Sequence, residues 1–175
     1  VAFDIDTPST SPLTNYTVSM GATATNALTA FIGTGLSPVY TAATYTPSAL
    51  RGFSNNTIIF TNPFSWNGTS NVVVDICFSN TVAQTTSASC KQSATSFGSY
   101  LVYRSNTVST CSGTTISAGG PQRPNMRFSQ NVQGTWSWSP DTSSTNRITV
   151  NPAATTVYTA SATFNGCSAS ATSSV

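Results

Sequence analysis

Acidic side chains are the first candidates for catalysis in this chain, which carries Asp4, Asp6, Asp75 and Asp141 and no histidine. The missing histidine excludes a Ser-His or Cys-His nucleophile pair. A glycosidase needs two carboxylates that face one substrate. Asp4 and Asp6 share one face of an expected strand, and a solvated strand edge is the simpler interpretation of that pair. The sequence therefore predicts that this chain is not an enzyme.

The residue patterns typical of metal and cofactor sites are absent from this sequence. There is no CxxC pair and no histidine, so a zinc site is not expected. Calcium held by Asp4, Asp6, asparagine and backbone carbonyls is the alternative, but no acidic loop of the usual spacing occurs. The run Gly119-Gly120-Pro121 lacks the lysine and the following helix of a phosphate-binding loop. We expect neither a metal nor a cofactor.

The four cysteines are the strongest sign of the compartment in which the protein works. They are Cys77, Cys90, Cys111 and Cys167. Structural disulfides are the favoured interpretation, and free buried thiols are the alternative. Four cysteines allow three complete pairings, and their spacing does not choose among them. Together with a single lysine and many Thr and Ser residues, they predict an exported, extracellular protein.

Tryptophans supply the one specific binding hypothesis. Trp66 stands beside Asn67 at an expected turn, and Trp136 and Trp138 share one strand face. Flat aromatic rings cover the apolar faces of sugars, while amides take the sugar hydroxyls. These four residues are therefore candidates for contact with a glycan or a partner. The alternative is structural: Trp66 caps the core, and the other two tryptophans pack where two modules meet.

Composition sets limits on size and on partners. A chain of 175 residues can bury about 70% of its extended surface, which is enough for a core without metals. Only 6% of the residues are charged, against about a quarter in ordinary domains. The net charge is +2, with one lysine and no basic stripe, so nucleic acid is not an expected partner. No apolar run reaches the length of a membrane span, so no membrane insertion is expected.

The segment 60–80 shows the clearest element pattern. It predicts a strand, a turn at residues 66–70 around Asn67-Gly68, and a second strand in which Val72, Val74, Ile76 and Phe78 share one face. An Asn-Gly turn between such runs is typical of a β-hairpin. The apolar face needs a covering layer, so the hairpin also predicts a second sheet.

Short strands and turns occupy the remainder of the chain. Further strands are expected at residues 1–6, 13–20, 39–45, 57–60, 100–104 and 125–128. Residues 22–35 are expected to be extended or looped chain, with a short helical turn as the alternative, and residues 105–122 read as a polar, glycine-rich loop. After a change of composition near Gln130, strands are expected at 147–150 and 157–164, with a turn at Asn165-Gly166. With no convincing amphipathic helix, the pattern predicts an all-β protein: a jelly-roll-like or immunoglobulin-like β-sandwich at 1–130, then a smaller immunoglobulin-like β module at 131–175.

Several sequence motifs resemble a known group of bacterial proteins. The run MGAT…VYTAATYTP…GF…IIFTNPFSWNGTSNVVVDICFSN…RPNMRF resembles a β-sandwich module of large surface proteins from gliding and related bacteria that use type IX secretion. The tail WSWSPDTSSTNRITVNPAATTVYTASATFNGCSASATSSV is similar to their immunoglobulin-like repeats, but lacks the early strands. The resemblance covers roughly residues 13–175. It implies an adhesin or a multi-module exoenzyme, with neighbouring modules of one long chain as partners.

Three functional classes follow from these observations. The first is a non-catalytic structural or adhesive module of a secreted cell-surface protein, either an adhesin or a stalk. The second is a carbohydrate-binding accessory module of an exported enzyme, with surface glycans as partners. The third is a self-assembling filament subunit, whose N-terminal strand with Phe3 and Ile5 leaves its own module and completes the sheet of another copy.

Overall fold

The structure is a computed structural model that describes residues 1–80, 86–105, 111, 113–129, 134–164 and 167–175. The fold is all-β, with 44% of the residues in strands that pair antiparallel in several small sheets, and with no α-helix among the residues described. The same part of the chain contains no helix that could cross a membrane. The chain divides into two compact units, Val1–Phe128 and Ser129–Val175, and each is described by itself.

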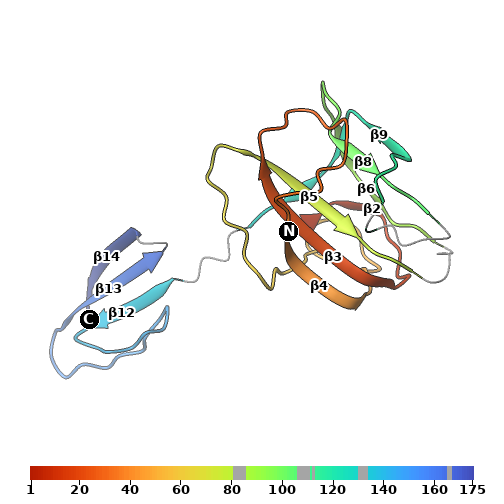
Figure 1. The fold of residues 1–175 in the computed structure, drawn as a ribbon. Helices are drawn as coiled ribbons and strands as arrows, with labels where there is room; N and C mark the ends of the chain where they lie inside the picture. The colour runs from red at the N-terminus through yellow and green to blue at the C-terminus, as the bar shows by residue number, and fades with distance from the viewer. Residues whose placement is uncertain (81–85, 106–110, 112, 130–133, 165–166) are drawn as a thin grey trace. The chain divides into compact units, whose positions relative to one another are not determined.

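The first unit is built on a three-stranded sheet of β3 (Leu13–Thr23), β4 (Ser37–Tyr45) and β5 (Asn71–Cys77). β3 lies in the middle, and β4 and β5 pair with it antiparallel on either side (Figure 1). The expected alternation along β3 is confirmed, because Tyr16, Val18 and Met20 are all buried. This face of the sheet carries the core.

Neither the hairpin predicted within residues 60–80 nor the strand predicted at 57–60 is formed, because residues 58–65 lie outside any strand. β5 pairs with β3, where Val18 lies opposite Ile76 and Met20 lies opposite Val74. Residues 61 and 62 instead donate their backbone amides to the carbonyl oxygen of Val39, at 2.9 and 3.1 Å. Because β5 is an edge strand, Val72 and Ile76 stay more than one-third exposed, while Val74 and Phe78 pack against the core.

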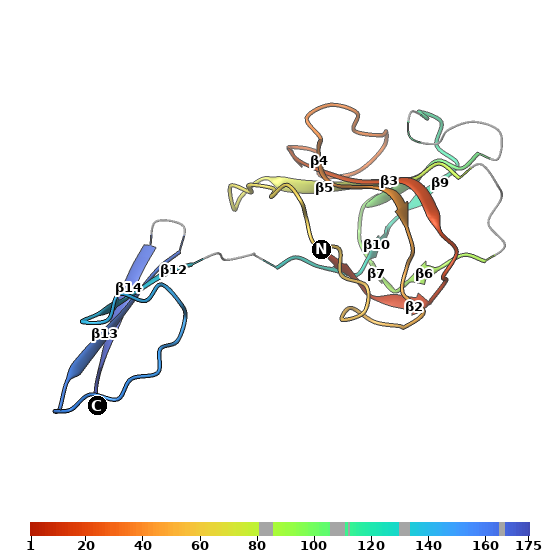
Figure 2. The same ribbon diagram turned by 90° about the horizontal axis from the view of Figure 1, so that it is seen from below.

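A second group of strands lies on the other side of the core. It contains β1 (Ala2–Phe3), β2 (Ile5–Thr7), β6 (Ser89–Cys90) and β11 (Met126–Arg127). Figure 2 shows β2 and β6 on the side of the unit opposite β3, β4 and β5. The core itself consists of buried residues from both sides: Val1, Tyr16, Val18, Met20, Val39 and Ile58.

Four short strands complete the first unit, and one of them falls where a loop was expected. They are β7 (Gln92–Ala94), β8 (Tyr100–Val102), β9 (Ala118–Gly120) and β10 (Gln122–Pro124). β8 pairs with β9, and β7 pairs with β10. The polar, glycine-rich stretch 105–122 carries no alternating apolar face, so its strand at 118–120 gave no pattern to detect.

The second unit is a three-stranded antiparallel sheet of β12 (Thr135–Ser139), β13 (Val157–Phe164) and β14 (Cys167–Ser174), in that order. The expected strand at 157–164 is confirmed as β13. The strand expected at 147–150 is wrong, since these residues are outside any strand. Two apolar residues, Ile148 and Val150, are half-buried there and can pack without ladder hydrogen bonds. The expected turn at Asn165-Gly166 lies outside the described residues.

Candidate functional site

The turn at residues 66–70 is fixed by the side chain of Asn67. Its Oδ1 accepts hydrogen bonds from the backbone amides of Thr69 at 3.0 Å and Ser70 at 2.9 Å, and its Nδ2 donates to Ser70 Oγ at 2.8 Å. Gly68 has φ of 80°, a left-handed conformation that glycine adopts without strain. The local sequence thus makes the predicted turn, although the turn does not join two paired strands.

Trp66 is presented by this turn as an exposed ring. Its indole Nε1 donates a hydrogen bond of 2.7 Å to the carbonyl oxygen of Ser70, and 56% of the residue surface remains exposed. The hydrogen bond orients the ring before any ligand arrives, which lowers the entropic cost of binding. Trp66 therefore does not cap the core, and its ring is available for contact.

The amide of Asn67 is used within the turn, and its contact with a glycan stays a prediction. Both polar atoms of its amide are engaged within the turn, with the amides of residues 69 and 70 and with Ser70 Oγ. A sugar hydroxyl would have to compete with these bonds. The geometry makes Asn67 the residue that positions Trp66.

Trp136 and Trp138 lie on β12 in the second unit. They are half-buried and lie opposite Ala162 and Ala160 of β13, whereas Ser137 between them is exposed. The indole Nε1 of Trp138 donates to the carbonyl oxygen of Thr145 at 2.9 Å, which ties the chain after β12 to the sheet. Packing within the second unit is the role that these contacts support.

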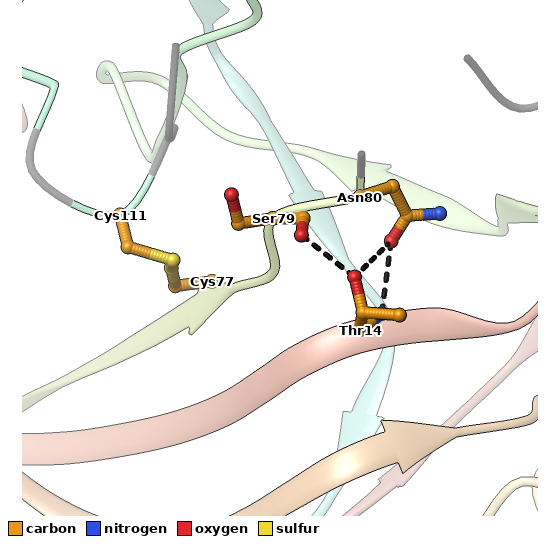
Figure 3. Close-up of a disulfide and its surroundings, with 5 residues drawn as sticks. All are labelled: Thr14, Cys77, Ser79, Asn80 and Cys111. Atoms are coloured by element: carbon orange, nitrogen blue, oxygen red, sulfur yellow. Dashed lines mark hydrogen bonds between the residues drawn. A yellow bond between two sulfur atoms is a disulfide. The ribbon is translucent and has the colours of Figure 1, made fainter. Parts of the chain in front are cut away.

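A disulfide joins Cys77, at the end of β5, to Cys111, with a Cα–Cα distance of 5.2 Å (Figure 3). Beside it, Thr14 of β3 donates its hydroxyl to the carbonyl oxygen of Ser79 at 2.6 Å. The backbone amide of Thr14 donates to Asn80 Oδ1 at 2.9 Å. These bonds fasten residues 79 and 80 to β3 just beyond β5. The disulfide then connects this corner to a segment 34 positions further along the chain.

Cys90 carries a free thiol, so the expectation of a disulfide at this position is not met. Its Sγ lies 3.8 Å from the carbonyl oxygen of Asn125. Burial raises the pKa of the Cys90 thiol, which disfavours the reactive thiolate. The side chain of Cys167 lies outside the part of the chain that the structure describes.

The acidic residues do not gather into one site. Asp4 pairs with Lys91, with 3.9 Å between Oδ1 and Nζ, and Asp75 lies opposite Ser19 on the central sheet. Among the described residues, no three His, Cys, Asp or Glu side chains come close enough to hold a metal ion.

Asp75 makes folding stability depend on pH in an unusual direction. Burial raises the pKa of its carboxyl above the ordinary value of 3.8, so the folded state binds this proton more tightly than the unfolded state. The contribution of Asp75 to stability therefore falls as pH rises through the interval between its unfolded and folded pKa. We expect Asp75→Asn to raise Tm relative to wild type at pH 7, and to raise it less at pH 3. Thermal unfolding at both pH values checks this, and an equal change of Tm at both would contradict it.

Phe3 and Ile5 lie in a segment with partners on both sides. Phe3 pairs with Met126, and its amide donates to the carbonyl oxygen of Asn56 at 3.1 Å. Ile5 pairs with Cys90, and its carbonyl oxygen accepts from the amide of Gly52 at 2.9 Å. The segment completes its own unit in this structure. Its exchange between copies stays a prediction.

Strand pairing also brings together segments that carry cations. The backbone hydrogen bonds of Lys91 and the pairing of β7 with β10 place Lys91 on the segment beside the one that carries Arg123 and Arg127, although no basic run marks these residues in the sequence. The signal available in the sequence was the alternation in QRPNMR, which places Arg123 and Arg127 on the same side of an extended chain.

Comparisons with protein-family models, curated proteins and solved structures give no match to this chain.

Proposed function

We propose that this chain is a non-catalytic structural and adhesive module of a secreted cell-surface protein, extracellular and joined to neighbouring modules of a longer chain. In this proposal the first unit is a β-sandwich and the second is a smaller immunoglobulin-like module. The observation that carries it is the Cys77–Cys111 disulfide within an all-β chain of which only 6% is charged. Such bonds persist in oxidising surroundings outside the cytosol.

Further support comes from the way the first unit is fastened. The disulfide and the Thr14 bonds hold the end of β5, and strands from both ends of the unit enclose the core. A module that bears load between neighbours benefits from such long-range links. The resemblance of the motifs to modules of large secreted surface proteins points the same way.

Attachment of coated beads tests the adhesive role. Beads carrying the full chain are expected to resist flow on surfaces coated with polysaccharides, and beads carrying an unrelated uncharged β protein are not. The surfaces should include one coated with a neutral polysaccharide and one coated with an acidic polysaccharide. If the coated beads attach to none of these surfaces, the adhesive role is contradicted.

The exposed Trp66 ring favours a second function, a carbohydrate-binding accessory module of an exported enzyme. The ring is oriented by its bond to Ser70 and is flat enough to stack on a sugar. We expect Trp66→Ala to weaken binding to a neutral glycan about tenfold, which corresponds to about 1.4 kcal/mol. Isothermal titration against a panel of neutral oligosaccharides measures this.

Two variants make this test specific. Trp66→Phe keeps an aromatic face without the indole hydrogen bond and should retain part of the affinity. Ile59→Ala removes an apolar side chain that is 75% exposed and should leave binding unchanged. If wild-type protein binds no neutral glycan, or if Ile59→Ala weakens binding as much as Trp66→Ala, the ring is not the contact.

A further inference from the structure

One outer face of the first unit concentrates charge in an otherwise nearly uncharged chain. Three segments meet there through backbone hydrogen bonds. The amide of Asp4 donates to the carbonyl oxygen of Asn125 at 3.1 Å, and that of Lys91 donates to the carbonyl oxygen of Asp4 at 2.8 Å. The amide of Asn125 donates to the carbonyl oxygen of Lys91, also at 2.8 Å.

The strand register determines which side chains point outward. Phe3 and Met126 are Cα partners and pack against the core. Neighbouring residues on a strand point to opposite faces, so Asp4 and Arg127 lie on the outer face. Arg123 is the partner of Ser93, and Ser93 Oγ donates to Asn125 Oδ1 at 2.7 Å, which places these three on the same face.

This basic face, defined as Lys91, Arg123 and Arg127, has an excess of positive charge. Half of the six cations of the chain lie on it, and Asp4 is the carboxylate that pairs with Lys91. Asp4 is largely buried, with 16% of its side chain exposed, whereas Lys91 is 56% exposed. At this ion pair a ligand therefore meets the lysine before the carboxylate.

Two contacts hold the cations in place. The guanidinium carbon of Arg127 lies 4.1 Å from the centre of the Phe53 ring, a cation–π contact that restricts its rotation. Lys91 is held beside Asp4 at 3.9 Å. Arg123 is exposed, and no described residue forms an ion pair with it. The planar guanidinium group of Arg123 can bind a carboxylate or a sulfate with two parallel hydrogen bonds.

The spacing of the cations selects among polyanions. Arg123 and Arg127 are four residues apart on an extended segment, which corresponds to about 13 Å. Double-stranded DNA carries one charge per about 1.7 Å of its axis, so two arginines at this distance would neutralise little of it. A polysaccharide with one acidic group per sugar carries its charges further apart than DNA, and it offers hydroxyls to Ser93, which lies opposite Arg123, and to Asn125, which lies between the two arginines.

We propose that the basic face binds an anionic polysaccharide through its carboxylate or sulfate groups. This inference rests on the proposed adhesive function and names the class of its ligand. The polysaccharide lies across the face, with Arg123 and Arg127 each engaging one acidic group and Lys91 adding attraction at the side.

The test uses the full chain and two polysaccharides, polygalacturonate for carboxylates and dextran sulfate for sulfates, with neutral dextran as the blank. The variant Arg123→Glu with Arg127→Glu is compared with the matched variant Arg104→Glu with Arg147→Glu. Both change the net charge by the same amount, and the second pair lies outside the basic face: Arg104 follows β8, and Arg147 belongs to the second unit. Biolayer interferometry at increasing NaCl gives the affinities and their salt dependence.

The wild-type chain is expected to bind at least one of the two polyanions at low salt. The face variant should weaken this binding at least about tenfold and flatten its salt dependence, and the matched variant should change affinity less than about threefold. Arg123→Gln with Arg127→Gln, with thermal unfolding measured alongside, separates lost contacts from misfolding. Preference for one polyanion identifies carboxylate or sulfate as the group recognised.

Other results would overturn the proposal. These are no binding of wild type to either polyanion, an equal loss in both double variants, or equally tight binding to duplex DNA or to phosphatidylserine vesicles. Adhesion of coated beads to neutral polysaccharide is independent of this face. If that adhesion persists while polyanion binding is absent, the ligand class is wrong and the adhesive function stands.

Discussion

Replacing Cys77 and Cys111 together by serine is expected to lower the free energy of unfolding by about 4 kcal/mol. The disulfide closes a loop with a sequence separation of 34 residues, and opening it lets the unfolded chain regain conformational entropy. The chain-entropy relation gives this magnitude for a loop of that size. Domains of this kind are stable by about 5–15 kcal/mol in total, so the loss is large. Urea unfolding monitored by tryptophan fluorescence measures it.

Cys90→Ser is the matched control for this prediction. It also exchanges sulfur for oxygen at a half-buried cysteine, but it breaks no bond between chain segments. We expect it to change the free energy of unfolding by less than about 1 kcal/mol. Mass spectrometry after alkylation in denaturant without reductant should find Cys77 and Cys111 unmodified and Cys90 modified. Alkylation of all three, or equal destabilisation by both changes, would show that the Cys77–Cys111 bond does not stabilise the fold.

Individual strands could be predicted from the sequence because their burial follows a period of two. Tyr16, Val18 and Met20 mark the covered face of β3, and the structure buries all three. The sequence pattern does not show in the same way which other strand a strand pairs with. Alternation in 71–78 shows that one face is covered, but the hydrogen-bonding edges are backbone groups that every residue shares. The Asn67-Gly68 turn suggested that residues 71–78 pair with the segment just before the turn. In the structure β5 pairs with β3, which lies some 50 residues earlier in the chain.

The candidate site was predicted in part for a similar reason. The turn at Asn67-Gly68 was local information, but the sequence left two roles open for Trp66, contact with a ligand or a cap on the core, and the structure exposes its ring. The use of the Asn67 amide within that turn was missed, because an asparagine that binds a ligand and one that holds a turn have the same sequence context. The basic face could not be predicted from the sequence. It depends on the pairing of Lys91 with Asp4 and of Arg123 with Ser93, and these pairs join segments that lie far apart in the chain.

Ile58→Ala is expected to lower the free energy of unfolding by about 3 kcal/mol. Ile58 is 3% exposed and belongs to the core, and its amide donates to the carbonyl oxygen of Val1 at 2.7 Å. Truncation removes buried methyl groups and leaves a cavity between the central sheet and the N-terminal segment, a change that typically costs about 2–5 kcal/mol. Chemical denaturation of the full chain, followed through the transition of the first unit, measures the loss.

Ile59→Ala is the natural control, because it makes the same chemical change one residue further along. Ile59 is 75% exposed, so its truncation should alter stability by no more than about 0.5 kcal/mol. The contrast between two adjacent isoleucines depends on one feature of the fold, namely which side of the extended segment 57–59 faces the core. Equal losses from the two variants, or a larger loss from Ile59→Ala, would mean that this segment is turned over. The N-terminal segment that Ile58 holds would then be placed wrongly as well, and with it the hydrogen bonds that bring Asp4 to Lys91 on the basic face.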